Sequence, residues 1–136
     1  MAKTDDPSVL VVDDDRNLRV TLSMILADEG YDVLTAQDAQ QALDLLDARP
    51  VDVVLMDIKM PGMRGDEACA KAKRMRPELP VVMITAHVAE DLARGALEAG
   101  ADSIHYKPLD VDRLLRRVAE LCTGRQRAAA RSISVA

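Results

Sequence analysis

Aromatic residues are almost absent from the sequence: there are two tyrosines, Tyr31 and Tyr106, and no tryptophan or phenylalanine. Proteins that bind single-stranded nucleic acid usually stack bases on aromatic side chains and attract the backbone with basic residues. The formal net charge of this chain is −5, which disfavours an approach to phosphates. The composition therefore argues against direct binding to nucleic acid.

Cysteines and long apolar runs are also scarce. Cys69 and Cys122 stand far apart with no cluster of Cys or His around them, so we expect reduced packing residues and neither a disulfide framework nor a zinc site. No apolar run approaches the roughly 18 residues that cross a bilayer. Residues 1–7 carry acids and a proline where a secretory signal would be basic and then apolar. These absences predict a soluble, cytoplasmic protein with no membrane partner.

The 136 residues fit one compact domain, and two kinds of apolar pattern alternate along them. Short apolar runs rich in β-branched residues predict strands at residues 9–12, 31–35, 51–56 and 81–84, and residues 103–106 are interpreted as a short fifth strand. Apolar residues at steps of three and four predict helices at residues 16–29, 39–49, 66–75, 89–99 and 111–121. Five strand–helix repeats indicate an α/β fold, a single doubly wound parallel sheet with right-handed crossovers and helices on both faces.

The domain boundaries follow from where these patterns start and stop. We place the domain at residues 8–122, with an N-terminal tail at 1–7 and a C-terminal tail or linker at 123–136. The C-terminal segment is basic and rich in alanine, which suits either a frayed helical end or the start of a linker to an output domain.

Polar residues follow four of the predicted strands at the point where each strand ends. They are Asp13 and Asp14 after the first strand, Asp57 after the third, Thr85 after the fourth and Lys107 after the fifth. In open parallel sheets the carboxyl ends of all strands lie at one edge, and ligands bind in the crevice there. The sequence therefore predicts that these five residues form one site.

Three carboxylates with one nearby amine repel each other unless a hard cation lies among them. Mg²⁺ prefers oxygen ligands, keeps several waters, and pairs with one or two carboxylates and a phosphate. We predict Asp14 and Asp57 as direct ligands, Asp13 as a ligand partly through water, and the Lys59 backbone carbonyl as a further oxygen donor.

A carboxylate can attack phosphorus and form an aspartyl phosphate. The charge that develops on the transferring oxygens then needs fixed positive and donor groups, and the Lys107 ammonium and the Thr85 hydroxyl are suitable. Because phosphoryl transfer depends mainly on positioning and electrostatics, a site without a histidine base can perform it. We therefore predict that Asp57 is a phosphoryl acceptor.

Four motifs in this order, VLVVDDD, LMDIKMPG, MITAH and YKP, resemble the receiver domain of two-component response regulators over about residues 8–122. The resemblance implies a flavodoxin-like (βα)5 fold with strand order 2-1-3-4-5. It also implies a signalling phosphoacceptor that catalyses its own phosphorylation and dephosphorylation, instead of an enzyme with a separate substrate.

The same resemblance implies roles for individual residues. Asp57 would accept a phosphoryl group from the phosphohistidine of a sensor histidine kinase or phosphotransfer protein, and Asp13 and Asp14 would hold Mg²⁺. Thr85 would be the switch hydroxyl, and Lys59 and His87 would tune dephosphorylation. The Lys107–Pro108 bond would be cis, and a downstream protein would bind the face formed by the fourth helix, the fifth strand and the last helix. The chain could also form a homodimer.

One position departs from the family pattern. Similar proteins usually carry Tyr or Phe three residues before the lysine, where this chain has Ile104, and Tyr106 directly precedes Lys107. Strand alternation places Ile104 and Tyr106 on the same face. The aromatic part of the switch is therefore weak, rebuilt around Tyr106, or absent.

Two other interpretations compete with an isolated receiver. The chain could be the receiver fragment of a larger transcriptional regulator. It could also be a phosphohydrolase of the haloacid dehalogenase type, with Asp13 as nucleophile and Asp15 as acid/base, although Asn17 departs from that pattern and Asp57 would have no task. The simpler role for Asp15 is to cap the first helix, since acids favour a helix start.

Overall fold

The computed structural model describes residues 6–86 and 90–122, with the backbone alone for residues 90–93. The strands are β1 (Ser8–Val12), β2 (Asp32–Ala36), β3 (Val53–Asp57), β4 (Val81–Thr85) and β5 (Ser103–Tyr106). The helices are α1 (Arg16–Asp28), α2 (Ala39–Ala48), α3 (Gly65–Met75) and α4 (Glu90–Glu98). A last helix over residues 111–122, called the C-terminal helix below, reaches the end of the described residues. The predicted order of strands and helices is confirmed.

All five strands pair in parallel, in the order β2-β1-β3-β4-β5 that the family resemblance implies. The interior strands β3 and β4 are buried along their whole length, which explains why they are nearly continuous apolar runs. β1 pairs with β3 so that Val12 lies opposite Met56. The residues that follow these two strands therefore emerge side by side.

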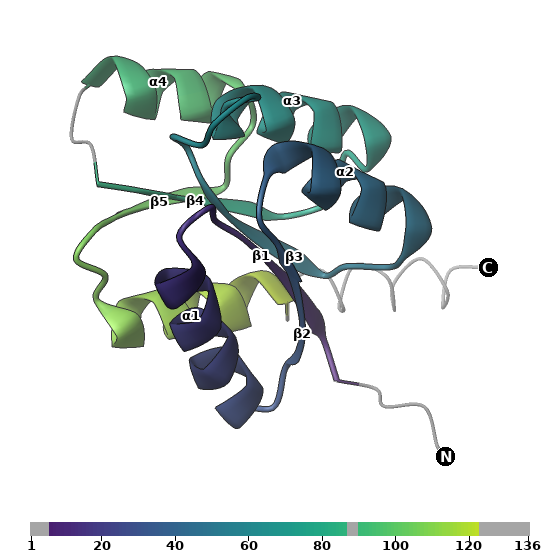
Figure 1. Cartoon of the computed structure of the whole chain (residues 1–136), viewed down its shortest axis with the longest axis vertical. Coiled ribbons are helices and arrows are strands. Elements are labelled where there is room, and N and C mark those ends of the chain that lie inside the picture. The colour runs from purple at the N-terminus through teal and green to yellow at the C-terminus, as the bar shows by residue number, and fades with distance from the viewer. Residues whose placement is uncertain (1–5, 87–89, 123–136) are drawn as a thin grey trace.

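Each face of the sheet carries its own apolar core. Figure 1 shows α2, α3 and α4 covering one face, and α1 with the C-terminal helix covering the other. The first core contains Leu10, Val54, Met83, Leu43, Ala68 and Ala96 among others. The second contains Val11, Leu55, Val82, Leu22, Leu26 and Leu114 among others. Alternate side chains of each strand thus pack on opposite faces, as a doubly wound sheet requires.

The helix ends follow the predicted local chemistry. Asp15 caps α1, because its side chain accepts hydrogen bonds from the backbone amides of Asn17 and Leu18. Asp110 caps the C-terminal helix, since its Oδ1 accepts from the Arg113 amide at 3.1 Å. Gly30, after α1, has a φ of 97°, a left-handed conformation that favours glycine.

The starts of β3 and α3 differ slightly from the prediction. Val51 is buried but lies before β3, because the ladder with β1 begins where Val9 pairs with Val53. α3 begins at Gly65, one residue earlier than expected. An apolar pattern in the sequence indicates which residues are buried. Because buried residues extend beyond the hydrogen-bonded ladder, the predicted strand began too early.

Both cysteines are buried, as expected for small packing residues, and neither forms a disulfide. Burial raises the pKa of Cys69 to about 11, so this thiol stays protonated and unreactive at neutral pH. Among the described residues, no helix combines the length and the apolar character needed to cross a membrane.

Candidate functional site

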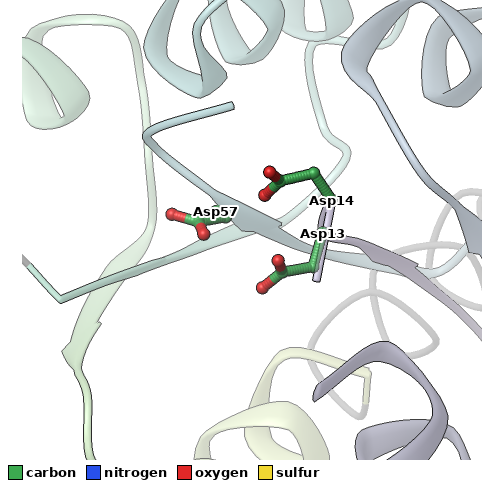
Figure 2. A group of neighbouring side chains, drawn as sticks. All are labelled: Asp13, Asp14 and Asp57. Carbon is green, nitrogen blue, oxygen red and sulfur yellow. The ribbon is translucent and has the colours of Figure 1, made fainter. Parts of the chain in front are cut away.

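The three predicted acids meet at the carboxyl ends of two neighbouring strands. Asp13 and Asp14 directly follow β1, and Asp57 is the last residue of β3. Oxygen atoms of the three carboxylates lie within 4.8 Å of one another. Figure 2 shows the three side chains projecting to the same side of these strand ends. Asp13 and Asp57 are buried and Asp14 is exposed, so the cluster opens to solvent on one side.

Lys107 provides the positive charge of the site. Its Nζ lies 3.0 Å from Asp57 Oδ2 and 3.4 Å from Asp13 Oδ2. Burial alone would lower the pKa of Lys107, but hydrogen bonds and charge attraction from the two carboxylates outweigh it, so the pKa is raised. The ammonium is therefore charged throughout the neutral range. The Lys107–Pro108 bond is cis, as the family resemblance implied.

Hydrogen bonds fix both the backbone and the side chain of Asp13. Its backbone amide donates to the Ala36 carbonyl at 3.2 Å, and its Oδ1 accepts from the Asp15 amide at 2.9 Å. Its backbone carbonyl accepts a hydrogen bond from Arg19 Nη1 at 2.7 Å. These three contacts fix the β1–α1 connection at Asp13.

Burial raises the pKa of Asp13, and the charge of Asp57 adds to the rise, while the Asp15 amide and Lys107 oppose it. The carboxyl group therefore keeps a proton more readily than a solvated aspartate. A cation that binds this cluster would compete with that proton. The affinity of the cluster for the cation should therefore increase as pH rises through the pKa of Asp13.

Two hydrogen bonds from backbone amides hold Asp57 and the residue that follows it. The amide of Lys59 donates to Asp57 Oδ1 at 3.1 Å, and the amide of Gly65 donates to the Ile58 carbonyl at 2.7 Å. A Cβ atom on Gly65 would overlap the Asp57 carbonyl oxygen and would lie 2.8 Å from both Ile58 Cα and Met83 Cε. The start of α3 therefore packs directly on the backbone of Asp57, which only glycine permits.

The other predicted residues lie around this centre. Thr85 is buried at the end of β4, and its carbonyl accepts from the Lys107 amide at 2.8 Å. Ile104 packs against the core that α2, α3 and α4 cover, and Tyr106 is 42% exposed. His87 lies outside the described residues. A backbone hydrogen bond thus connects Thr85 with Lys107, while Tyr106 lies at the surface.

The donor set fits Mg²⁺ by its chemistry. Three carboxylates within 4.8 Å supply hard oxygen ligands and more negative charge than Lys107 balances. The described residues offer no cysteine or histidine in this cluster, so the ligands are of the kind that Mg²⁺ and Ca²⁺ prefer and Zn²⁺ does not.

Two residues at this site were not identified from the sequence. Arg19 falls inside the helix predicted at residues 16–29, and Gly65 directly precedes the helix predicted at residues 66–75. The residue type alone does not indicate either role. The contact of Arg19 depends on how α1 crosses the end of β1, and that of Gly65 on how α3 crosses the end of β3. The only signal was Gly65 itself, close behind Gly62 in the segment after Asp57.

Comparisons with known proteins agree with this geometry. The family model described as "Response regulator receiver domain" matches residues 9–119. Response regulator MprA of Mycolicibacterium vanbaalenii is 38% identical over 113 residues, which cover 83% of this chain and 49% of that protein. Transcriptional regulatory protein TcrA of Mycobacterium tuberculosis is 35% identical over 113 residues, with 83% of this chain and 45% of that protein covered. The chain spans about half the length of these curated relatives.

Solved structures show the same fold. The receiver domain protein (CheY-like) from Methanospirillum hungatei matches with a TM-score of 0.87 and 31% identity, covering 91% of this chain and 99% of that one. NtrX from Brucella abortus matches with a TM-score of 0.84 and 34% identity, covering 95% of this chain and 29% of that one. With the family match spanning most of the sequence, the chain belongs to the response regulator receiver domain family.

Proposed function

We propose that this receiver accepts a phosphoryl group on Asp57 from the phosphohistidine of a sensor histidine kinase or phosphotransfer protein. The observation that carries the proposal is the ion pair of Lys107 with Asp57, 3.0 Å long, beside two further carboxylates at the open end of the sheet. The proposed nucleophile, its counter-charge and the proposed cation ligands thus lie together, although they come from the ends of three different strands.

In the proposed step, an Asp57 carboxylate oxygen forms a bond to phosphorus while the bond from phosphorus to the donor imidazole breaks. The electron pair of that bond stays on the imidazole nitrogen, which then takes a proton from solvent. Lys107 remains beside the acceptor and stabilises the negative charge on the transferring oxygens, together with the Thr85 hydroxyl. The Lys59 amide, 3.1 Å from Asp57 Oδ1, keeps the carboxylate in one orientation.

Asp13, Asp14 and Asp57 would hold Mg²⁺, with the Lys59 carbonyl as a further ligand. A bound Mg²⁺ supplies positive charge that offsets the repulsion between the three carboxylates and the incoming phosphoryl oxygens. Asp13 and Asp14 then act as ligands only, and Lys59 and His87 adjust access of water to the aspartyl phosphate.

Phosphorylation would shift an equilibrium between two conformations and change the face formed by α4, β5 and the C-terminal helix. Features of this face support a docking role: Leu97 is 58% exposed and Tyr106 42% exposed. Between β5 and the C-terminal helix lies a small pocket lined by Ile104, His105, Tyr106, Pro108, Asp110 and Arg113. With Ile104 partly buried against the core and Tyr106 at the surface, we propose that Thr85 acts in the switch without an inward-turning ring at position 104.

The proposal is tested by incubating the protein with a small phosphodonor, with Mg²⁺ or with a chelator. We expect one phosphoryl group per chain with Mg²⁺, and a rate lower by on the order of 100-fold after chelation, because the carboxylates then repel the donor. Intact-protein mass spectrometry measures both quantities. Steady hydrolysis of phosphomonoesters with Asp57 left unphosphorylated would instead favour the haloacid dehalogenase interpretation.

A second proposal follows from the lengths of the relatives. Because this chain spans about half of MprA and of TcrA, which is named a transcriptional regulatory protein, we propose that the receiver controls a transcriptional output. Reading the native coding sequence on both sides of these 136 residues decides whether that output is attached or is a separate partner.

A further inference from the structure

Arg19 makes an unusual contact for a half-buried arginine. It lies in the second turn of α1, and its Nη1 donates to the backbone carbonyl of Asp13 at 2.7 Å. None of the ion pairs found among the described residues includes Arg19. The guanidinium is thus directed at the main chain of the acid pair and not at a carboxylate.

The hydrogen bond from Arg19 restrains more than the Asp13 carbonyl oxygen that accepts it. The Asp13 carbonyl and the Asp14 amide belong to one planar peptide unit, so a hydrogen bond to that oxygen limits rotation of the whole unit. The plane sets the direction in which the Asp14 side chain leaves the backbone. Asp14 is exposed, and the structure gives its carboxylate no hydrogen-bond donor among the described residues, unlike those of Asp13 and Asp57. Its placement therefore depends on its backbone.

We propose that Arg19 is a positioning residue for the cation site, holding the Asp13–Asp14 peptide so that both carboxylates face Asp57. The proposal rests on the proposed function in one respect, that the acid cluster binds Mg²⁺. Outer-sphere partners that orient ligands commonly change metal affinity by 10-fold to 100-fold when they are removed.

Charge alone makes the opposite prediction. A guanidinium beside the cluster repels a cation, so removing it would tighten Mg²⁺ binding if its only influence were electrostatic. If Arg19 only stabilised α1, its loss would lower the free energy of unfolding and leave the affinity of the folded protein unchanged. The sign of the change in affinity therefore separates positioning from both alternatives.

The test is isothermal titration of Mg²⁺ into the full chain as wild type, Arg19→Met, Arg19→Lys and Arg16→Met. We expect Arg19→Met to weaken binding by about 10-fold or more and Arg19→Lys to recover part of the loss, because its ammonium can still donate. Arg16 is the matched control, an exposed arginine on the same helix, and its replacement should leave binding unchanged or slightly tighter. Nuclear magnetic resonance of the metal-free protein should show the Asp14 amide shifted in Arg19→Met.

Equal or tighter Mg²⁺ binding by Arg19→Met would overturn the proposal. Should this variant fail to fold in a urea unfolding control, Arg19→Ala also removes both the charge and the donor, favours the helix, and is judged by the same criterion. Failure of the wild type to bind Mg²⁺ would refute the proposed function itself, whereas normal wild-type binding with an unchanged variant refutes only the role of Arg19.

Discussion

Replacing Asp57 with asparagine is expected to lower the rate of phosphoryl uptake by on the order of 10³-fold or more, the scale of loss when a nucleophile is removed. Asparagine has nearly the same shape and can still accept the hydrogen bond from the Lys59 amide. It lacks the negative charge needed to attack phosphorus and to pair with Lys107. Uptake from a small phosphodonor with Mg²⁺, followed by intact-protein mass spectrometry, measures the loss.

Asp15→Asn is the matched control for this substitution. Asp15 lies two residues from Asp13 but is exposed, and it caps α1, a role that asparagine fills equally well. Its replacement should leave uptake within about 2-fold of the wild type. If the Asp57→Asn variant were phosphorylated normally and the Asp13→Asn variant were inactive, the nucleophile would be Asp13 instead of Asp57.

Replacing Gly65 with alanine is expected to lower the free energy of unfolding by about 3 kcal/mol, at the upper end of the usual cost of overpacking. The added Cβ would overlap the Asp57 carbonyl oxygen and come within 2.8 Å of Ile58 Cα, and backbone atoms yield less readily than side-chain ends. α3 or the end of β3 must therefore move. Urea unfolding measures the loss of stability.

The same substitution should also slow phosphorylation of the folded protein, by about 100-fold if Asp57 moves by roughly 1 Å. Gly95→Ala is the matched control, because its Cβ would meet only the end of the Asp66 side chain, at 3.3 Å. Alanine in the middle of α4 should be neutral or stabilising by up to about 1 kcal/mol. Equal stability of the Gly65→Ala and Gly95→Ala variants would contradict the close packing of α3 on Asp57.

The arrangement of helices and strands was predictable because each segment carries one clear periodicity. Buried β-branched runs such as residues 53–56 differ sharply from the helical stripe of Leu22 and Leu26. The strand order was not predictable from the residues, since parallel apolar strands such as β1 and β4 offer similar pairing surfaces. It came from the family resemblance and is confirmed.

The centre of the site was predictable for a geometric reason: in a parallel sheet, residues at the carboxyl ends of neighbouring strands must meet. Asp13, Asp14 and Asp57 do so, and Lys107 reaches two of them. Arg19 and Gly65 were missed because their contacts are with backbone atoms, which carry no signal in the sequence. Contacts of this kind depend on the exact crossing of a helix over a strand end.

Locating the phosphoryl group tests the central claim most directly. The wild-type protein is phosphorylated with a small donor and Mg²⁺, digested rapidly, and its peptides are sequenced by tandem mass spectrometry. We expect the phosphoryl group on Asp57 alone, and uptake slower by on the order of 100-fold when Mg²⁺ is chelated. A phosphoryl group on Asp13, or on a serine or threonine with Asp57 unmodified, would contradict the assignment of Asp57 as the acceptor.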